Sequence, residues 1–240
     1  MCTAVVWPLP DGYLFAFNRD EVVWRTNAIP PAPRGLFLAP IDPEGGGTWL
    51  ATNAFGLTLA ALNVYEEAAR EPQEPIRSRG LLVTDLADAA DLRMLATRVQ
   101  NHPHLRHTRP FHLLAVASDH AVLEAHWDGL ALTLTHAVLP ILRVSAAFDA
   151  PAVHAARILE FSNLQADLCV CIHKSTALRT WFSSHEQHGS PRGVCMHREP
   201  IAATVSHTQV HVKQMQTEMW YVAGAPCQDP PEFRVTLSRS

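Results

Sequence analysis

The first 21 residues, MCTAVVWPLPDGYLFAFNRDE, predict a β-hairpin that ends in a polar run. Two β-rich segments, 3–7 and 13–17, flank a turn region with two prolines and an Asp-Gly pair, the usual signal of a tight hairpin. In an antiparallel pair, the end of the second strand returns to the start of the first. We therefore expect Asn18-Arg19-Asp20-Glu21 to follow the second strand and to lie beside Cys2.

The rest of the chain alternates groups of strands with groups of helices. Further strands are expected at 48–52, 57–62, 111–117, 122–127, 130–135, 194–197, 204–212 and 218–223. Helices are expected as two short pieces between Ser78 and Val99 and as one stretch from 151 to about 165. The segments 27–35 and 40–47 are expected to be loops, the type of 167–188 stays open, and the tail is Pro-rich. This grouping favours a layered α+β fold over βαβ units, in a single domain spanning 1–240.

The composition excludes several classes of protein. With 19 Lys+Arg against 23 Asp+Glu and no basic block, the chain lacks the charge pattern of a nucleic-acid-binding protein. No apolar run reaches the roughly 18 residues that a membrane span needs. The five cysteines are odd in number and irregularly spaced, which favours a reducing compartment over a disulfide framework. Because no signal peptide is recognisable at the start, we expect a cytoplasmic protein.

Cys2 is the residue with the most distinctive chemistry. Removal of the initiator Met would leave a thiol nucleophile and an α-amine, with an ordinary pKa of about 7.7 to 8.0, on one residue. A carboxylate at Asp20 could orient the ammonium, and the Arg19 guanidinium could favour the thiolate. Alternatively, Cys2 is only a small apolar residue that opens a buried strand. Arg19 and Asp20 would then form an ordinary surface ion pair.

Three motifs together resemble one family. They are Met1-Cys2, Asn18-Arg19-Asp20-Glu21 followed by Arg25, and Gly46-Gly47-Thr48-Trp49-Leu50. They resemble the NRDE family, also called the transport and Golgi organisation 2 family; Asn63 and Arg77-Ser78-Arg79-Gly80 extend the likeness. That family is similar to the cysteine branch of the N-terminal nucleophile (Ntn) hydrolases, which includes bile-salt hydrolases and penicillin V acylases. The resemblance implies a four-layer αββα sandwich.

The same resemblance assigns roles to individual residues. It implies that Cys2 is the nucleophile, that Arg19 and Asp20 are its polar partners, and that Asn63 donates to the oxyanion. Asn18 and Trp49 are expected to bind substrate. The implied reaction is hydrolysis of a non-peptide amide in a small acylated molecule, with no cofactor. The alternative is a non-catalytic cytosolic carrier of haem or lipid, because eukaryotic members are associated with haem trafficking and lipid handling.

The second half departs from the family pattern at two points. Ala146 stands where the resemblance implies an Asn after a strand, and no Arg occurs near residues 204–206.

The cysteines and histidines of the second half allow a metal hypothesis. Cys169-x-Cys171-x-His173 and Cys195-x-His197 offer soft thiolates and imidazoles that suit zinc. Their spacing departs from the common zinc motifs. Buried cysteines and surface histidines that bind no metal are the alternative interpretation of the pattern, so no metal ligand is assigned. The glycines at 45–47 are expected to form a turn rather than a phosphate cradle, because no Gly-Lys-Ser/Thr follows.

Overall fold

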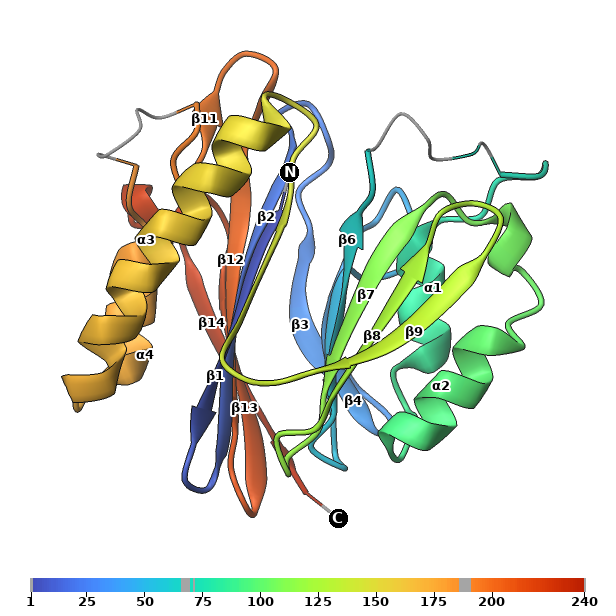
Figure 1. Cartoon of the computed structure of the whole chain (residues 1–240), viewed down its shortest axis with the longest axis horizontal. Helices are drawn as coiled ribbons and strands as arrows, with labels where there is room; N and C mark the ends of the chain where they lie inside the picture. Colours follow the sequence, from blue (N-terminus) through green and yellow to red (C-terminus); the bar gives the residue numbers. More distant parts are fainter. Residues whose placement is uncertain (1, 66–69, 71, 186–190, 240) are drawn as a thin grey trace.

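The computed structural model describes residues 2–65, 70, 72–185 and 191–239. Within these residues, two seven-stranded antiparallel sheets pack face to face, and helices cover their outer faces (Figure 1). The fold is therefore the expected four-layer αββα sandwich.

Sheet A contains the predicted hairpin at its centre. Its strand order is β10-β1-β2-β12-β13-β14, with β11 paired to β12. The bounds are β1 (Cys2–Leu9), β2 (Gly12–Val22), β10 (Ile141–Ser145), β11 (His197–Arg198), β12 (Ala202–Val212), β13 (Gln216–Val222) and β14 (Glu232–Ser238). The hairpin is confirmed, and Cys2 pairs with Arg19. However, the polar tetrapeptide belongs to β2 rather than following it, because β12 pairs with β2 on its other side and satisfies the backbone there.

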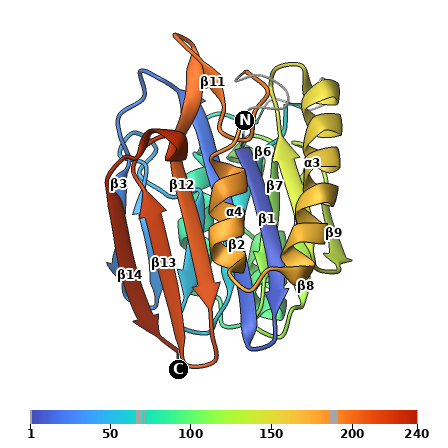
Figure 2. The same ribbon diagram turned by 90° about the vertical axis from the view of Figure 1, so that its left-hand side faces the viewer.

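Sheet B runs largely in chain order. It comprises β3 (Ile29–Arg34), β4 (Phe37–Ile41), β5 (Leu50–Asn53), β6 (Thr58–Asn63), β7 (Phe111–Val116), β8 (Val122–Trp127) and β9 (Leu132–Ala137). The meander over β7 to β9 is confirmed. The predicted loop at 27–35 is wrong, since it contains β3 despite three prolines. β3 is an edge strand, where a missing N–H need not break a ladder, and Figure 2 shows it beside β14 of sheet A.

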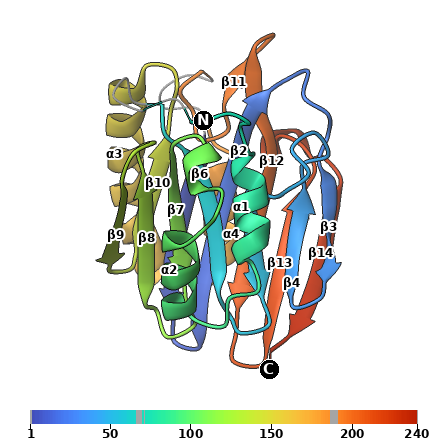
Figure 3. The same cartoon turned by 90° about the vertical axis from the view of Figure 1, so that its right-hand side faces the viewer.

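The helices form the two outer layers. α1 (Arg79–Leu86) and α2 (Leu92–Gln100) cover sheet B (Figure 3), whereas α3 (Ala150–Val170) and α4 (Lys174–Phe182) cover sheet A (Figure 2). Short 3-10 turns lie at η1 (Leu105–His107) and η2 (Pro226–Gln228). The Ser78 hydroxyl accepts from the Gly80 N–H and caps α1. The segment 167–188, for which the sequence predicted no definite secondary structure, contains the end of α3 and all of α4. No helix in the described part of the chain has the length and apolarity to cross a bilayer.

Three apolar layers hold the sandwich together. The central one lies between the sheets and joins side chains of both, among them Val6, Phe15, Phe17, Leu50, Leu62 and Leu114. The others lie between sheet B and its helices and between sheet A and its helices. Burying each such side chain contributes about 1.5–3 kcal/mol. Tyr13 of sheet A also reaches across the centre, with its hydroxyl 2.8 Å from Thr58 Oγ1 of sheet B.

Candidate active site

The start of β1 and the end of β2 line a cavity of about 280 Å³. Both sheets and the loop before α1 contribute to it. The predicted site residues that line it are Cys2, Arg19, Asp20, Trp49 and Asn63, and it also contains Glu21, Arg25, Asp42, Arg77, Arg79 and Arg109. Five of the six predicted site residues therefore surround one space.

Cys2 is buried at the start of β1, opposite Arg19 of β2 and Ser145 of β10. Burial raises the pKa of its thiol above the ordinary value. The backbone N–H of Asp20, which hydrogen-bonds to the sulfur, and the Arg19 guanidinium act in the opposite direction. Because burial prevails, a base is needed to generate the thiolate.

Asp20 is buried, and one of its two carboxylate oxygens accepts a hydrogen bond. Its Oδ1 accepts from the Thr204 hydroxyl at 2.6 Å, whereas its Oδ2 has no hydrogen-bond partner among the described residues. Burial raises the pKa of this carboxyl group. The hydroxyl of Thr204 is held in turn by the Met196 N–H at 2.8 Å. A carboxylate oxygen buried in this way is suited to a cationic donor.

Arg19 is fixed from two sides. Its Nη2 donates to Asp42 at 3.1 Å, and its guanidinium carbon lies 4.3 Å from the centre of the Trp49 ring, a cation–π distance. The indole Nε1 of Trp49 is buried and has no acceptor among the described residues. Arg19 thus keeps a positive charge beside Cys2, and Trp49 offers an unused donor near the cavity.

Asn63 ends β6 on the other sheet. Its side-chain amide donates to the Tyr65 hydroxyl at 2.7 Å, and its backbone carbonyl accepts from the Ser145 hydroxyl at 2.5 Å. Since Ser145 pairs with Cys2, this bond between the sheets holds Asn63 near the thiol. An amide nitrogen carries two hydrogens, so one is left for a ligand in the cavity.

Asn18 is the predicted site residue that does not line the cavity. Successive side chains of a strand point to opposite faces, and Asn18 points toward the helices. Its amide donates to the carbonyls of Phe182 and Val194, each at 2.9 Å, and its oxygen faces His207 Nδ1 at 2.8 Å. These bonds attach the helical layer to sheet A and occupy the side chain.

Arg157 was not identified from the sequence. It lies on α3, fully buried, and its Nη1 donates to the Thr3 hydroxyl at 2.6 Å while Nη2 donates to the carbonyl of Gly193. Its charge partly offsets the rise that burial causes in the pKa of Asp20. Thus a buried guanidinium comes from α3, although the resemblance implied an arginine near 204–206. The available signal was a charged pair, Arg157 and Glu160, on the otherwise apolar face of a helix.

The cavity contains more arginine charge than acidic charge. Arg25 pairs with Asp42, and Arg77 pairs with Asp85. By contrast, Arg79 and Arg109 take part in no ion pair among the described residues, and Arg79 donates only to the Pro110 carbonyl, at 2.9 Å. Burial, and the like charge of Arg109, lower the pKa of Arg79. Within the ranges that the structure describes, these two guanidiniums have no carboxylate partner, and unpaired guanidiniums are the groups that favour an anion.

The cysteines and histidines assemble differently from the sequence hypothesis. Cys195 and His197 do come together, but their neighbour is Cys227, which no spacing pattern in the sequence connects to them. Cys169 and Cys171 lie at the end of α3 instead.

Comparison with solved structures identifies similar folds. The penicillin V acylase of Agrobacterium tumefaciens matches at a TM-score of 0.59 and 13% identity, covering 98% of this chain and 86% of that one. A C2A variant of the conjugated bile acid hydrolase of Clostridium perfringens matches at 0.59 and 11%, covering 100% and 97%. The N-acylethanolamine-hydrolyzing acid amidase ortholog of Caenorhabditis elegans matches at 0.60 and 10%, covering 90% and 94%. These proteins are Ntn hydrolases, so the sandwich is of the Ntn-hydrolase type.

The sequence comparisons concern curated proteins and protein families. No curated protein matches the chain. Residues 1–218 match the family Transport and Golgi organisation 2. This range includes all the residues discussed at the cavity. The chain belongs to the Transport and Golgi organisation 2 family.

Proposed function

We propose that this protein hydrolyses the amide bond of a small acylated molecule through a thioester on Cys2. The observation that carries the proposal is the convergence of three groups on one cavity: the Cys2 thiol, the Asp20 carboxylate and the Asn63 amide. Each group has a distinct role in acyl transfer.

The first step requires removal of Met1, which frees the α-amine of Cys2. The amine accepts the thiol proton, and the unpartnered Oδ2 of Asp20 stabilises the resulting ammonium. The sulfur then attacks the substrate carbonyl carbon. The free hydrogen of the Asn63 amide and a backbone N–H hold the oxyanion, for which one such donor is typically worth about 2.7–4 kcal/mol.

The second half of the cycle releases both products. The carbon–nitrogen bond breaks, the leaving amine takes its proton from the α-ammonium, and the acyl group stays on sulfur as a thioester. Water, deprotonated by the same α-amine, attacks the thioester and releases a carboxylic acid and the thiol. One residue thus supplies the nucleophile and the base.

The cavity also favours a class of substrate. Its volume of about 280 Å³ lies near the lower limit of ordinary ligand sites, roughly 300–1,000 Å³. Arg79 and Arg109 favour a negative charge on the substrate, such as the carboxylate of an N-acyl amino acid. A small acylated amine with an acidic group fits both features.

The test is an intact-mass measurement after incubation with a library of N-acyl amino acids and their neutral carboxamides. We expect loss of Met1, an acyl adduct on Cys2, and faster adduct formation with the acidic members. Cys2→Ala should form no adduct, and Cys169→Ser, which changes an exposed thiol elsewhere, should behave like the parent. Arg79→Gln should slow the acidic substrates selectively, whereas Arg106→Gln, outside the cavity, should not. Retention of Met1 would exclude the mechanism.

A carrier of haem or lipid is the alternative use of the same cavity. It predicts binding of an acyl molecule without adduct or turnover, and for haem a shift of the Soret band on titration. An unchanged Soret band would exclude the haem form of this alternative. The charged lining of the cavity supports hydrolysis of a polar substrate over transport of an apolar one.

A further inference from the structure

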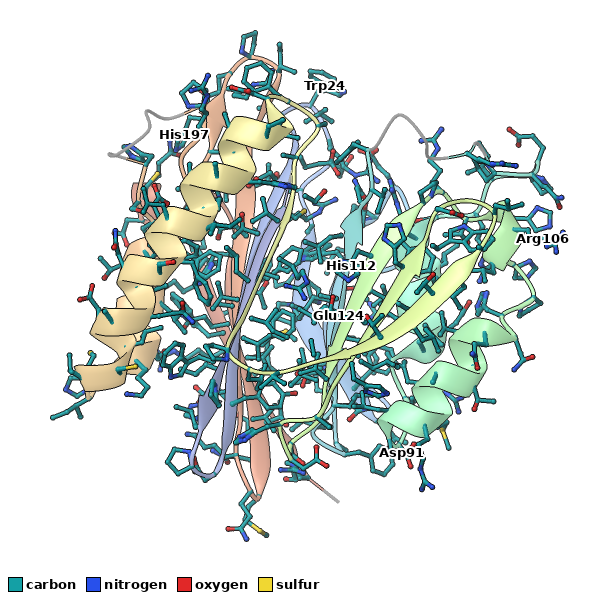
Figure 4. The ribbon with its side chains drawn as sticks, in the orientation of Figure 1. Trp24, Asp91, Arg106, His112, Glu124 and His197 are labelled. Atoms are coloured by element: carbon teal, nitrogen blue, oxygen red, sulfur yellow. The ribbon has the colours of Figure 1, made fainter. Side chains whose placement is uncertain are left out.

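Two cysteines and two histidines gather where β11 and η2 meet the end of α4. The sulfurs of Cys195 and Cys227 lie 3.4 Å apart, and His197 Nε2 lies 3.7 Å from the first and 3.1 Å from the second. Ligand atoms of His185, His197 and Cys227 all lie within 4.8 Å of one another. Figure 4 shows His197 at β11, on the outer side of sheet A. None of the four residues lines the cavity of Cys2.

We propose that Cys195, Cys227, His185 and His197 bind one structural zinc ion. A tetrahedral ion with Zn–S of about 2.3 Å and Zn–N of about 2.0–2.1 Å requires its ligand atoms to be roughly 3.3–3.8 Å apart. The measured separations of Cys195, Cys227 and His197 lie at or close to this range. The ligand atom of His185 lies within 4.8 Å of those of His197 and Cys227, and His185 would move closer to take the fourth position.

A disulfide fits the cluster less well than a metal. A disulfide requires the sulfurs at about 2.05 Å, well short of the 3.4 Å observed, and it gives the imidazoles no role. On binding, Zn²⁺ forms two bonds to sulfur, and the two thiol protons pass to solvent.

The ion would stabilise the segment whose hydrogen bonds hold Thr204 against Asp20. The segment 193–198 supplies the carbonyl of Gly193 to Arg157 and the N–H of Met196 to Thr204, the residue that donates to Asp20. Zinc would connect this segment to η2 through Cys227 and to the chain after α4 through His185. With four protein ligands the site is closed, as in structural rather than catalytic zinc sites.

The experiment uses the full chain purified under reducing conditions without chelator. We expect about one zinc ion per chain by elemental analysis, and Co²⁺ in its place should give a thiolate charge-transfer band and the visible bands of tetrahedral coordination. Cys227→Ser, at an exposed position, should weaken zinc affinity by more than the about 10- to 100-fold typical of losing an outer ligand partner. Cys169→Ser is the matched control and should retain full binding.

The outcomes separate this site from the proposed hydrolysis. Cys2→Ala should bind zinc like the parent, because its thiol is not a ligand. His197→Gln should lose the tetrahedral cobalt spectrum while its circular dichroism shows an intact fold. Zinc affinity of Cys227→Ser equal to that of the parent, or a Cys195–Cys227 disulfide in the reduced preparation, would overturn the proposal.

Discussion

At the scale of single residues, Asp20 is the most informative position to change. Asp20→Asn keeps an oxygen that accepts from Thr204 but removes the charge that would hold the α-ammonium of Cys2. We expect the fold to persist and the rate of thioester formation to fall by about 10²-fold or more, the usual scale of acid–base assistance. Single-turnover mass spectrometry measures this rate. Asp119→Asn, at an exposed turn, should leave it unchanged, and an unaltered rate in Asp20→Asn would refute the assigned role.

Which residues meet at the site was predictable only where local geometry decides it. The neighbourhood of Cys2 and Arg19 follows from hairpin register, because a short turn fixes the pairing. Asn18 was predicted to bind substrate at the same site as its neighbour Arg19. Adjacent side chains of a strand face opposite ways, so the alternation along β2 would already have placed Asn18 on the other face of the sheet. Arg157 could not be assigned in advance, since its contact with Thr3 depends on how α3 packs on sheet A.

At the scale of elements, the loop over residues 42–49 and the start of α1 form one wall of the cavity. The Thr48 N–H donates to the Gly80 carbonyl at 3.0 Å, and a Cβ built on Gly47 would lie 2.1 Å from the Gly80 carbonyl carbon. Glycine is needed at Gly47 because the two backbones touch there. The turn predicted for residues 45–47 thus positions Trp49 in the cavity.

Gly47→Ala should separate this loop from α1. We expect a loss of about 1–3 kcal/mol in the free energy of unfolding, as for other overpacked positions, together with slower thioester formation because Trp49 moves. Urea denaturation measures the first effect. Gly45→Ala is the control, since its added Cβ would first meet the Ser78 hydroxyl at 3.1 Å, a side-chain atom that can move. Equal stability of both variants would contradict the packing argument.

Among the elements, patterns of local sequence sufficed for the meander of sheet B and for the helical pair on its outer face. β3 was missed because its prolines argue against a strand, and only the sheet edge explains how they are tolerated. The sequence did not predict α4. Its buried residues, Leu178 and Phe182, pack against β2, and this tertiary contact is not visible in the local sequence.

At the scale of the whole molecule, a partly buried ion pair joins the two sheets. Arg143 of sheet A donates through Nε at 2.9 Å and through Nη2 to Glu124 of sheet B, and His112 Nε2 lies 2.7 Å from the same carboxylate. Figure 4 shows His112 and Glu124 in the space between the sheets. Burial opposes ionisation of Glu124, but the hydrogen bonds from His112 and Arg143 prevail and lower its pKa to about 2.

This pair predicts how the stability of the sandwich depends on pH. Glu124 ionises near 4.5 when unfolded and near 2 when folded, so its contribution is fully present above pH 4.5, about 3 kcal/mol, and is lost as the pH falls toward 2. Glu124→Gln should therefore be less stable than the parent at pH 7, and the difference in free energy of unfolding should shrink by about half at pH 3. Urea denaturation at the two pH values measures it. Asp119→Asn should show little difference at either pH, and a Glu124→Gln deficit that does not change with pH would mean that packing, rather than the charge of Glu124, joins the sheets.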